Sequence, residues 1–265
     1  MVVPRRAFLS GLSAAAAAPV VLGTAGCANS GNSTPTAPKL GDVLDSTREY
    51  LASELADAPT AARVAPWLID VGLTWAPPTA SLDSFAFVIG YSFGNRTPPG
   101  GGDPTKVLPL PGPVNKQLAD TIAAITTRRT MPVYAQWEIA RILASEHAMT
   151  DVVSIEPVRA ADGTITYLST DGVAAQILSK RKTIPSGVGR ACIVGFRDHV
   201  KRCVLTTRAR GIDAYAPDGI SMPDTYDPHS AQAWTRRRDV YLVHDMGAQW
   251  AMKKSQLLAE LYPNG

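Results

Sequence analysis

The chain has 265 residues, of which 45% are hydrophobic and 18% are charged, and its formal net charge is +3. This composition is ordinary for a globular protein with one large domain or two small ones. The low charge and the 7% aromatic content argue against a nucleic-acid-binding protein, which normally presents a strongly basic surface with aromatic side chains for stacking.

Residues 1–27 have the plan of an export signal. Arg5 and Arg6 precede an alanine-rich run that is too short and weakly apolar for a retained membrane span, and small residues follow before Cys27. The stretch PRRAFL resembles the twin-arginine consensus, which implies export of a folded protein. GTAGC resembles the lipobox of bacterial lipoproteins, although Thr24 stands where leucine is commonest. We therefore predict a lipoprotein anchored to the outer face of the cytoplasmic membrane through lipidated Cys27, with cleavage into a free secreted protein as the alternative.

The next two segments lead into the folded part of the chain. Residues 28–40 are rich in Ser, Thr, Asn, Gly and Pro and predict a disordered tether. Residues 41–57 have leucines at helical spacing and end before Pro59, and a second short helix or irregular packing follows. We therefore expect a helical extension over residues 41–80.

From residue 81 onward, short apolar runs alternate with segments of helical periodicity. This alternation predicts one α/β domain over residues 81–265, a Rossmann-like three-layer sandwich with a mainly parallel sheet. In such sheets, ligands bind beyond the carboxyl ends of the strands. The strands are expected at residues 84–90, 131–136, 151–158, 190–196 and 213–217.

The first predicted strand ends at Gly90, and the loop that follows it carries Asn95 and Arg96. Glycine allows a ligand to approach the backbone closely, and the two polar side chains can donate to phosphate or carboxylate. The spacings of the P-loop and of the dinucleotide fingerprint are absent. GYSFG resembles a nucleophile elbow around Ser92, but prolines and glycines follow where a helix should begin, so a Ser92 hydrolase stays only an alternative.

The second and third strand ends each supply one candidate. Glu138 lies in the first turn of the predicted helix after the second strand, where a carboxylate is equally explained by the helix dipole or by a ligand contact. Thr170 lies with Ser169 and Asp171 at the next helix start, and all three residue types are common helix caps.

The fourth strand is followed by Arg197, His199 and Arg202. The spacing of three places His199 and Arg202 on one face of the first helical turn, near free backbone amides, which suits an anionic group. The alternative is a solvated basic helix face. Because four strand ends supply polar residues to the same edge, we favour a single anion pocket.

Two further kinds of site are weakly supported. The four histidines show no spacing typical of metal ligands, so we predict no metal site. Cys192 and Cys203 could form a disulfide in an exported protein, but their spacing does not require one.

The order of these motifs resembles the bacterial domain-of-unknown-function family that includes SanA, ElyC and YdcF. The family's fourth strand runs into a TSxxHxxRA motif, and VGFRDHVKRC places His199 and Arg202 at its histidine and arginine. The family also has a glutamate after its second strand and a threonine after its third strand, which correspond to Glu138 and Thr170. Gly195 and Phe196 replace the TS pair of the motif.

The resemblance covers about residues 84–242. Its last part, residues 226–242, is similar to the family's late helix, in which a paired arginine and acid correspond to Arg238 and Asp239. The resemblance implies a Rossmann-like fold and a role in cell-envelope biogenesis and lipid-carrier metabolism. It also implies nucleotide-like or S-adenosylmethionine ligands for some members, which leaves the cofactor of this chain unknown.

Together these features predict an envelope protein that binds, and hydrolyses or transfers, a phosphate-containing small molecule. His199 and Glu138 are the candidate catalytic residues, and His199 would serve as general acid, since histidine titrates near neutral pH. A non-enzymatic envelope factor that acts through protein contacts is the main alternative. The anion would be held by Gly90, Asn95, Arg96, Arg197, His199 and Arg202, with Glu138 and Thr170 orienting the rest of the molecule.

Overall fold

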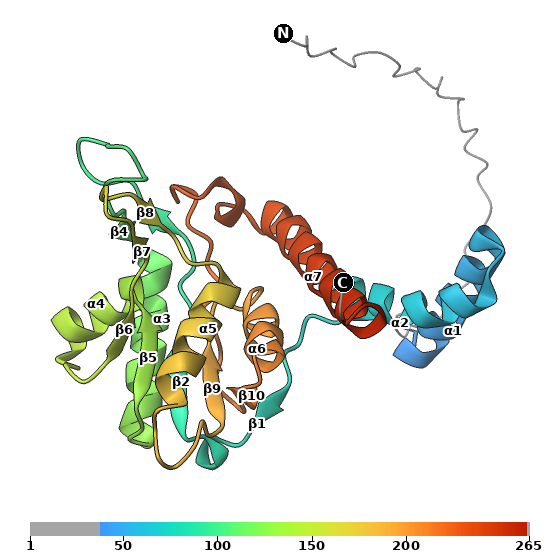
Figure 1. The fold of residues 1–265 in the computed structure, drawn as a ribbon, viewed down its shortest axis with the longest axis horizontal. Coiled ribbons are helices and arrows are strands. Elements are labelled where there is room, and N and C mark those ends of the chain that lie inside the picture. The colour runs from blue at the N-terminus through green and yellow to red at the C-terminus, as the bar shows by residue number, and fades with distance from the viewer. Residues whose placement is uncertain (1–37, 264–265) are drawn as a thin grey trace, which may run out of the picture. The chain divides into compact units, whose positions relative to one another are not determined.

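The computed structural model describes residues 38–263, and Figure 1 shows its mixed α/β fold. The predicted export signal, lipidated Cys27 and nearly all of the tether lie outside the described residues. No helix in the described part of the chain has the length and apolar character needed to cross a membrane.

The centre of the fold is a six-stranded sheet in which every neighbouring pair of strands is parallel. This confirms the predicted Rossmann-like α/β fold class. The two central strands, β2 and β9, are buried along their whole length, as continuous apolar runs in parallel sheets require. In sheet order the strands are β1 (Thr79–Ala80), β10 (Ala214–Pro217), β9 (Ala191–Val194), β2 (Phe87–Gly90), β5 (Val133–Gln136) and β6 (Val153–Ile155).

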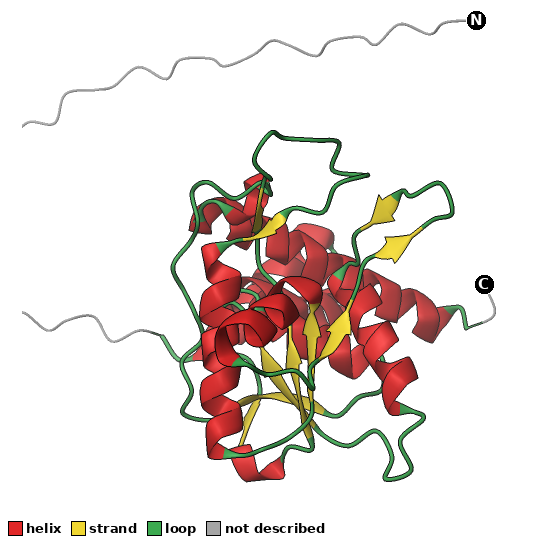
Figure 2. Cartoon of the chain, turned by 90° about the vertical axis from the view of Figure 1, so that its left-hand side faces the viewer, coloured by secondary structure: helices red, strands yellow, loops and turns green. Residues whose placement is uncertain are grey.

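Helices cover both faces of this sheet (Figure 2). The helices α3 (Pro113–Arg128) and α4 (Trp137–His147) share one hydrophobic core with the sheet, and α5 (Thr170–Arg181) and α6 (Val200–Ala209) share the other. The chain runs outward from β2 to β6 and then returns through α5 to β9, on the other side of β2. The helices that follow β2 and β9 therefore lie on opposite faces, which opens a crevice at the carboxyl ends of these two strands.

Two small hairpins rise at the same end of the domain (Figure 2). The first pairs β3 (Asn95–Arg96) with β4 (Leu110–Pro111), and the second pairs β7 (Val158–Arg159) with β8 (Ile165–Thr166). The strand predicted over residues 151–158 is thus divided between the central sheet and the second hairpin.

The remaining elements lie at the two ends of the described chain. The long helix near the C-terminal end, Arg238–Leu261, covers 24 residues. It begins only after most of residues 226–242, the segment that the family resemblance predicts to be helical. The region before it, expected to belong to that helix, is mainly irregular. These elements are α1 (Leu40–Leu55), α2 (Ala58–Leu73), the 3-10 helices η1 (Leu82–Ser84) and η2 (Ala233–Thr235), and α7 (Arg238–Leu261).

The helical extension is attached to the α/β domain through a buried lysine. Lys201 in α6 is almost completely buried, and its ammonium group donates to the backbone carbonyls of Asp70 and Thr74 at the end of α2. The Asp70 carboxylate also lies 2.9 Å from Lys201 Nζ and 3.0 Å from Nζ of Lys253 in α7. Two helices of the main domain therefore hold α2.

Replacing Lys201 with methionine should release α2. We expect a loss of about 1–3 kcal/mol, the usual contribution of hydrogen bonds to a charged group, and faster amide hydrogen exchange over residues 58–73 by mass spectrometry. Lys253→Met is the matched control, because its more exposed ion pair with Asp70 should contribute less than about 1 kcal/mol. Equal effects of the two variants would contradict this assignment.

Cys192 and Cys203 are not bonded to each other. Both are completely buried, and burial raises the pKa of the Cys192 thiol to about 12 and that of Cys203 well above its ordinary value. Both therefore act as small core residues in β9 and α6.

Candidate functional site

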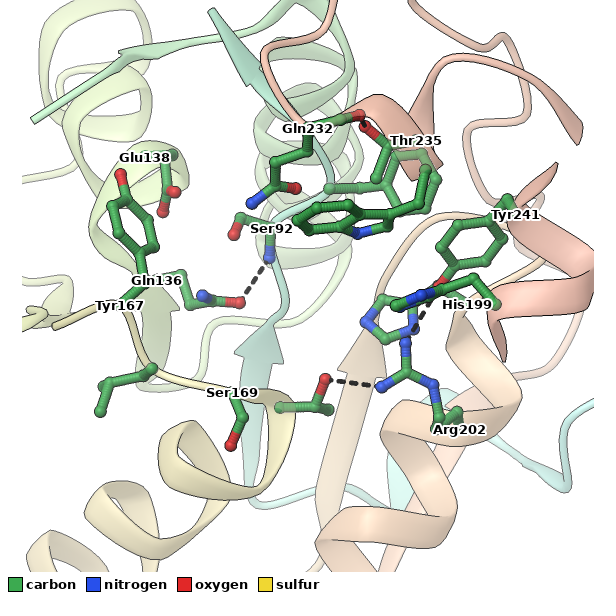
Figure 3. Close-up of a pocket in the computed structure, with 16 residues that line it drawn as sticks. Ser92, Gln136, Glu138, Tyr167, Ser169, His199, Arg202, Gln232, Thr235 and Tyr241 are labelled. Atoms are coloured by element: carbon green, nitrogen blue, oxygen red, sulfur yellow. Dashed lines mark hydrogen bonds between the residues drawn. The ribbon is translucent and has the colours of Figure 1, made fainter. Parts of the chain in front are cut away.

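A pocket of about 290 Å³ lies at the carboxyl edge of the sheet, where the strand order predicts a crevice (Figure 3). Segments that follow β2, β5, β8 and β9 form most of its wall, and the region from Gln232 to α7 closes it. The lining residues are Ser92, Phe93, Gly94, Gln136, Glu138, Tyr167, Leu168, Ser169, Thr170, His199, Arg202, Gln232, Trp234, Thr235, Tyr241 and His244.

Four of the predicted site residues meet in this pocket, namely Glu138, Thr170, His199 and Arg202. Glu138 follows β5, and His199 and Arg202 follow β9, whereas Thr170 follows the β7–β8 hairpin; the four lie at the starts of α4, α5 and α6. The parallel strands β5 and β9 bring Glu138, His199 and Arg202 to one edge of the sheet, and the hairpin places Thr170 beside them.

Gly90 and Asn95 lie outside the pocket. A Cβ atom at Gly90 would approach Ile122 Cδ1 to 2.7 Å, so this glycine allows α3 to pack closely on the sheet. Asn95 is buried in the first hairpin, where its backbone carbonyl accepts a hydrogen bond of 2.8 Å from the Ala231 amide. Neither residue lines the pocket, so the ligand contacts predicted for Gly90 and Asn95 are not placed there.

Arg96 and Arg197 are also held away from the pocket. Arg96 forms a two-bonded ion pair with Asp227, in which its Nη2 lies 2.8 Å from the carboxylate. Arg197 Nη1 donates to Asp224 at 2.5 Å. Acids from the irregular segment before α7 therefore occupy both guanidinium groups, and the predicted cradle of arginines does not form at this pocket.

Arg202 is held by three protein groups at the base of the pocket. Its Nε donates to Asp245 at 2.5 Å, Nη1 to the Thr170 hydroxyl at 3.0 Å, and Nη2 to the Tyr241 hydroxyl at 3.2 Å. An arginine has five N–H donors. One N–H group therefore remains on each terminal nitrogen for a ligand.

Thr170 is free to bind Arg202 because its neighbour caps the helix. The Ser169 side chain accepts a hydrogen bond of 3.1 Å from the Gly172 amide at the start of α5. The expectation that Ser169 or Thr170 is a helix cap is thus met by Ser169, and Thr170 contributes its hydroxyl to the pocket.

His199 is a neutral imidazole in this environment. Only 5% of its surface is exposed, and its Nδ1 lies 3.6 Å from Asp245 Oδ1. Burial and the charge of Arg202 lower the pKa of His199 to about 4. The histidine is therefore unprotonated at neutral pH and lacks the proton that its predicted role as general acid requires.

Asp245 is the central residue that the sequence analysis missed. It is completely buried and accepts from Arg202, from the Tyr241 hydroxyl at 3.1 Å and from Gln249 Nε2 at 2.8 Å. Although burial acts to raise it, the adjacent His199 and Arg202 hold the pKa of Asp245 at about 2. The spacing of four between Tyr241, Asp245 and Gln249 could have indicated a buried polar row on one helix face.

The arginine and acid assigned by resemblance to the late helix are not partners. Arg238 forms two hydrogen bonds of 3.0 and 3.1 Å with Asp198, and Asp239 pairs with Arg237 at 2.8 Å on the surface. The acid of α7 that pairs with an arginine of the pocket is Asp245.

Glu138 is a buried carboxyl group on the opposite wall from Arg202 (Figure 3). Only 1% of its surface is exposed, and Oε2 has no hydrogen-bond partner among the described residues. Burial raises the pKa of Glu138 to about 7, against the opposing effects of its own backbone amide and the Ser92 side chain. This carboxyl group is therefore the one in the pocket that titrates near neutral pH.

Ser92 lines the pocket without the geometry of a nucleophile elbow. Within residues 38–263, Ala56 and Ala148 are the non-glycine residues with positive φ, so Ser92 does not have the strained turn of that motif. The next helix, α3, begins only at Pro113. The Ser92 amide instead donates to Gln136 Oε1 at 2.8 Å.

Comparisons with known proteins do not add to this description. No family model matches the chain, and no curated protein or solved structure matches it significantly. The resemblance to the SanA, ElyC and YdcF family stays a prediction. The described residues contain no group of three or more His, Cys, Asp or Glu side chains placed to hold a metal ion.

Proposed function

We propose that this pocket binds the phosphate group of a small molecule, and that the protein acts on this molecule in the cell envelope. The observation that carries the proposal is the meeting of Arg202, Thr170 and the start of α5 at one side of the pocket. Two free N–H groups of Arg202 are suited to two oxygens of one phosphate.

The start of α5 adds to this anion site. Backbone amides in the first turn of a helix have no partner within the helix, and the helix dipole favours a negative charge there. Ser169 uses its side chain for one of these amides, that of Gly172. The preceding amides remain available beside Thr170, next to the Arg202 guanidinium.

Proton transfer is proposed for Glu138 rather than His199. A general acid or base is most effective when its pKa lies near the working pH. Glu138 meets this condition with a pKa of about 7, whereas the pKa of His199 is about 4. In this proposal His199 accepts a hydrogen bond from the ligand, and Glu138 exchanges the proton during hydrolysis or transfer.

The phosphate site is tested by Arg202→Lys. Lysine keeps the positive charge beside Asp245 but loses the two free N–H groups, so affinity for inorganic phosphate should fall about 10- to 100-fold, which corresponds to about 1.5–3 kcal/mol. Isothermal titration calorimetry on the full chain measures this change.

Arg197→Lys provides the matched control, because this arginine follows the same strand but is paired with Asp224 outside the pocket. Its phosphate affinity should equal that of the wild type. An unchanged affinity in Arg202→Lys, or the same loss in both variants, would overturn the proposed site.

A further inference from the structure

The pocket has two chemically different halves (Figure 3). Arg202 and His199 lie on one side, and Glu138 and Tyr167 lie on the other. The half around Glu138 has no lysine or arginine among its lining residues. The Arg202 half is therefore the half suited to a phosphate, which leaves the Glu138 half for a different part of the ligand.

The Glu138 half contains buried polar atoms that have no partner. Glu138 Oε2 and the Tyr167 hydroxyl are both buried and make no hydrogen bond within the described chain. Buried polar atoms are nearly always satisfied, by protein, water or ligand. An ionised Glu138 would repel a second anion, so the group that fits here carries O–H or N–H donors and no negative charge.

Neutral groups surround these atoms. Gln136 uses its Oε1 for the Ser92 amide, which leaves its side-chain NH₂ group available, and Gln232 adds a second amide to the lining. Hydroxyl and amide groups can both donate and accept hydrogen bonds. This mixture suits a ligand with several hydroxyl groups, each of which also donates and accepts.

An exposed tryptophan also lines the pocket. Trp234 lines the pocket and is 42% exposed, although large apolar side chains are normally buried. His244 stacks on one face of its indole, with ring centroids 5.5 Å apart and an interplanar angle of 20°. The other face is therefore accessible, and it offers an apolar surface to a ring whose edge carries the polar groups.

We infer that the ligand is a sugar phosphate, with its phosphate at Arg202 and Thr170 and its sugar ring between Trp234 and the polar wall of Gln136, Glu138 and Tyr167. A pyranose has the required form, because its C–H face packs on an aromatic ring while its hydroxyl groups point outward. This inference rests on the proposed phosphate site and names the class of molecule that carries the phosphate.

The experiment compares four kinds of probe by calorimetry on the full chain in a phosphate-free buffer. The probes are inorganic phosphate, the 1-phosphates of glucose, galactose and N-acetylglucosamine, the corresponding free sugars, and the nucleotides AMP and UMP. We expect at least one hexose 1-phosphate to bind about tenfold more tightly than inorganic phosphate, and more tightly than either nucleotide.

Trp234→Ala should remove this gain and leave the affinity for inorganic phosphate unchanged. The exposed tryptophan can be truncated without opening the core, and Tyr50→Ala, which removes an aromatic ring 70% exposed on α1, is the control. The sugar assignment fails if no hexose phosphate exceeds inorganic phosphate, if the gain survives in Trp234→Ala, or if a nucleotide binds more tightly. If no phosphorylated probe binds at all, the proposed function itself fails.

Discussion

Asp245→Ala is expected to lower the free energy of unfolding by about 3–5 kcal/mol, the cost of leaving a buried charge without its partner. Asp245 is completely buried and balances Arg202, whose Nε lies 2.5 Å away. Its removal also leaves the Tyr241 hydroxyl and Gln249 without an acceptor. Urea unfolding at pH 7 measures the change.

Two further variants separate the buried charge from general damage to α7. Asp239→Ala removes an exposed acid from the same helix, and its solvent-screened surface ion pair with Arg237 should contribute little to stability. The double variant Asp245→Leu with Arg202→Met should regain most of the stability, because no charge remains buried. A double variant as unstable as Asp245→Ala would show that the loss comes from packing.

Glu138→Gln is expected to make the protein more stable at alkaline pH. The pKa of Glu138 is about 7 in the folded protein, against an ordinary value of 4.5, and each pKa unit corresponds to about 1.4 kcal/mol. Because the folded pKa is raised, the contribution of Glu138 to stability is fully present below about pH 4.5 and is lost as the pH rises through 7. The advantage of the variant over wild type should therefore grow by about 2–3 kcal/mol between pH 5 and pH 9.

The same variant should lose activity. If the protein turns over a phosphorylated substrate, Glu138→Gln should reduce the rate of phosphate release about 10²- to 10⁴-fold, the usual contribution of a general acid or base, without weakening phosphate binding. Glu146→Gln, at an exposed position of the same helix, is the control for both measurements. Phosphate binding without turnover in the wild type would instead favour the non-enzymatic envelope factor.

The sequence predicted those parts of the fold that depend on local pattern. The apolar runs around Phe87–Gly90 and Ala191–Val194 have no polar face, which is typical of strands covered on both sides, and both are central strands of the sheet. Glu138, Thr170, His199 and Arg202 were found because a parallel sheet brings its strand ends to one edge. Thr170 joins them through the β7–β8 hairpin rather than directly from a strand of the sheet.

The remaining assignments depended on contacts between distant segments. Arg96 and Arg197 have the residue type of an anion site, but Asp227 and Asp224, which follow more than 25 residues later in the chain, bind them. Asp245 was missed for the same reason, since its partner Arg202 is 43 residues earlier. The low pKa of His199 and the raised pKa of Glu138, on which the proposed proton-transfer role of Glu138 rests, both follow from burial, which only the packed structure determines.

The helix α7 takes part in both the pocket and the attachment of the helical extension. Its first turns supply Tyr241, His244 and Asp245 to the site, and Lys253 further along binds Asp70 of α2. On α6, Lys201 binds α2 while the next residue, Arg202, lines the pocket. The same two helices thus contact both the pocket and α2, so a ligand that tightened α6 against α7 would stabilise the docked extension, and docking would then strengthen binding by the same free energy.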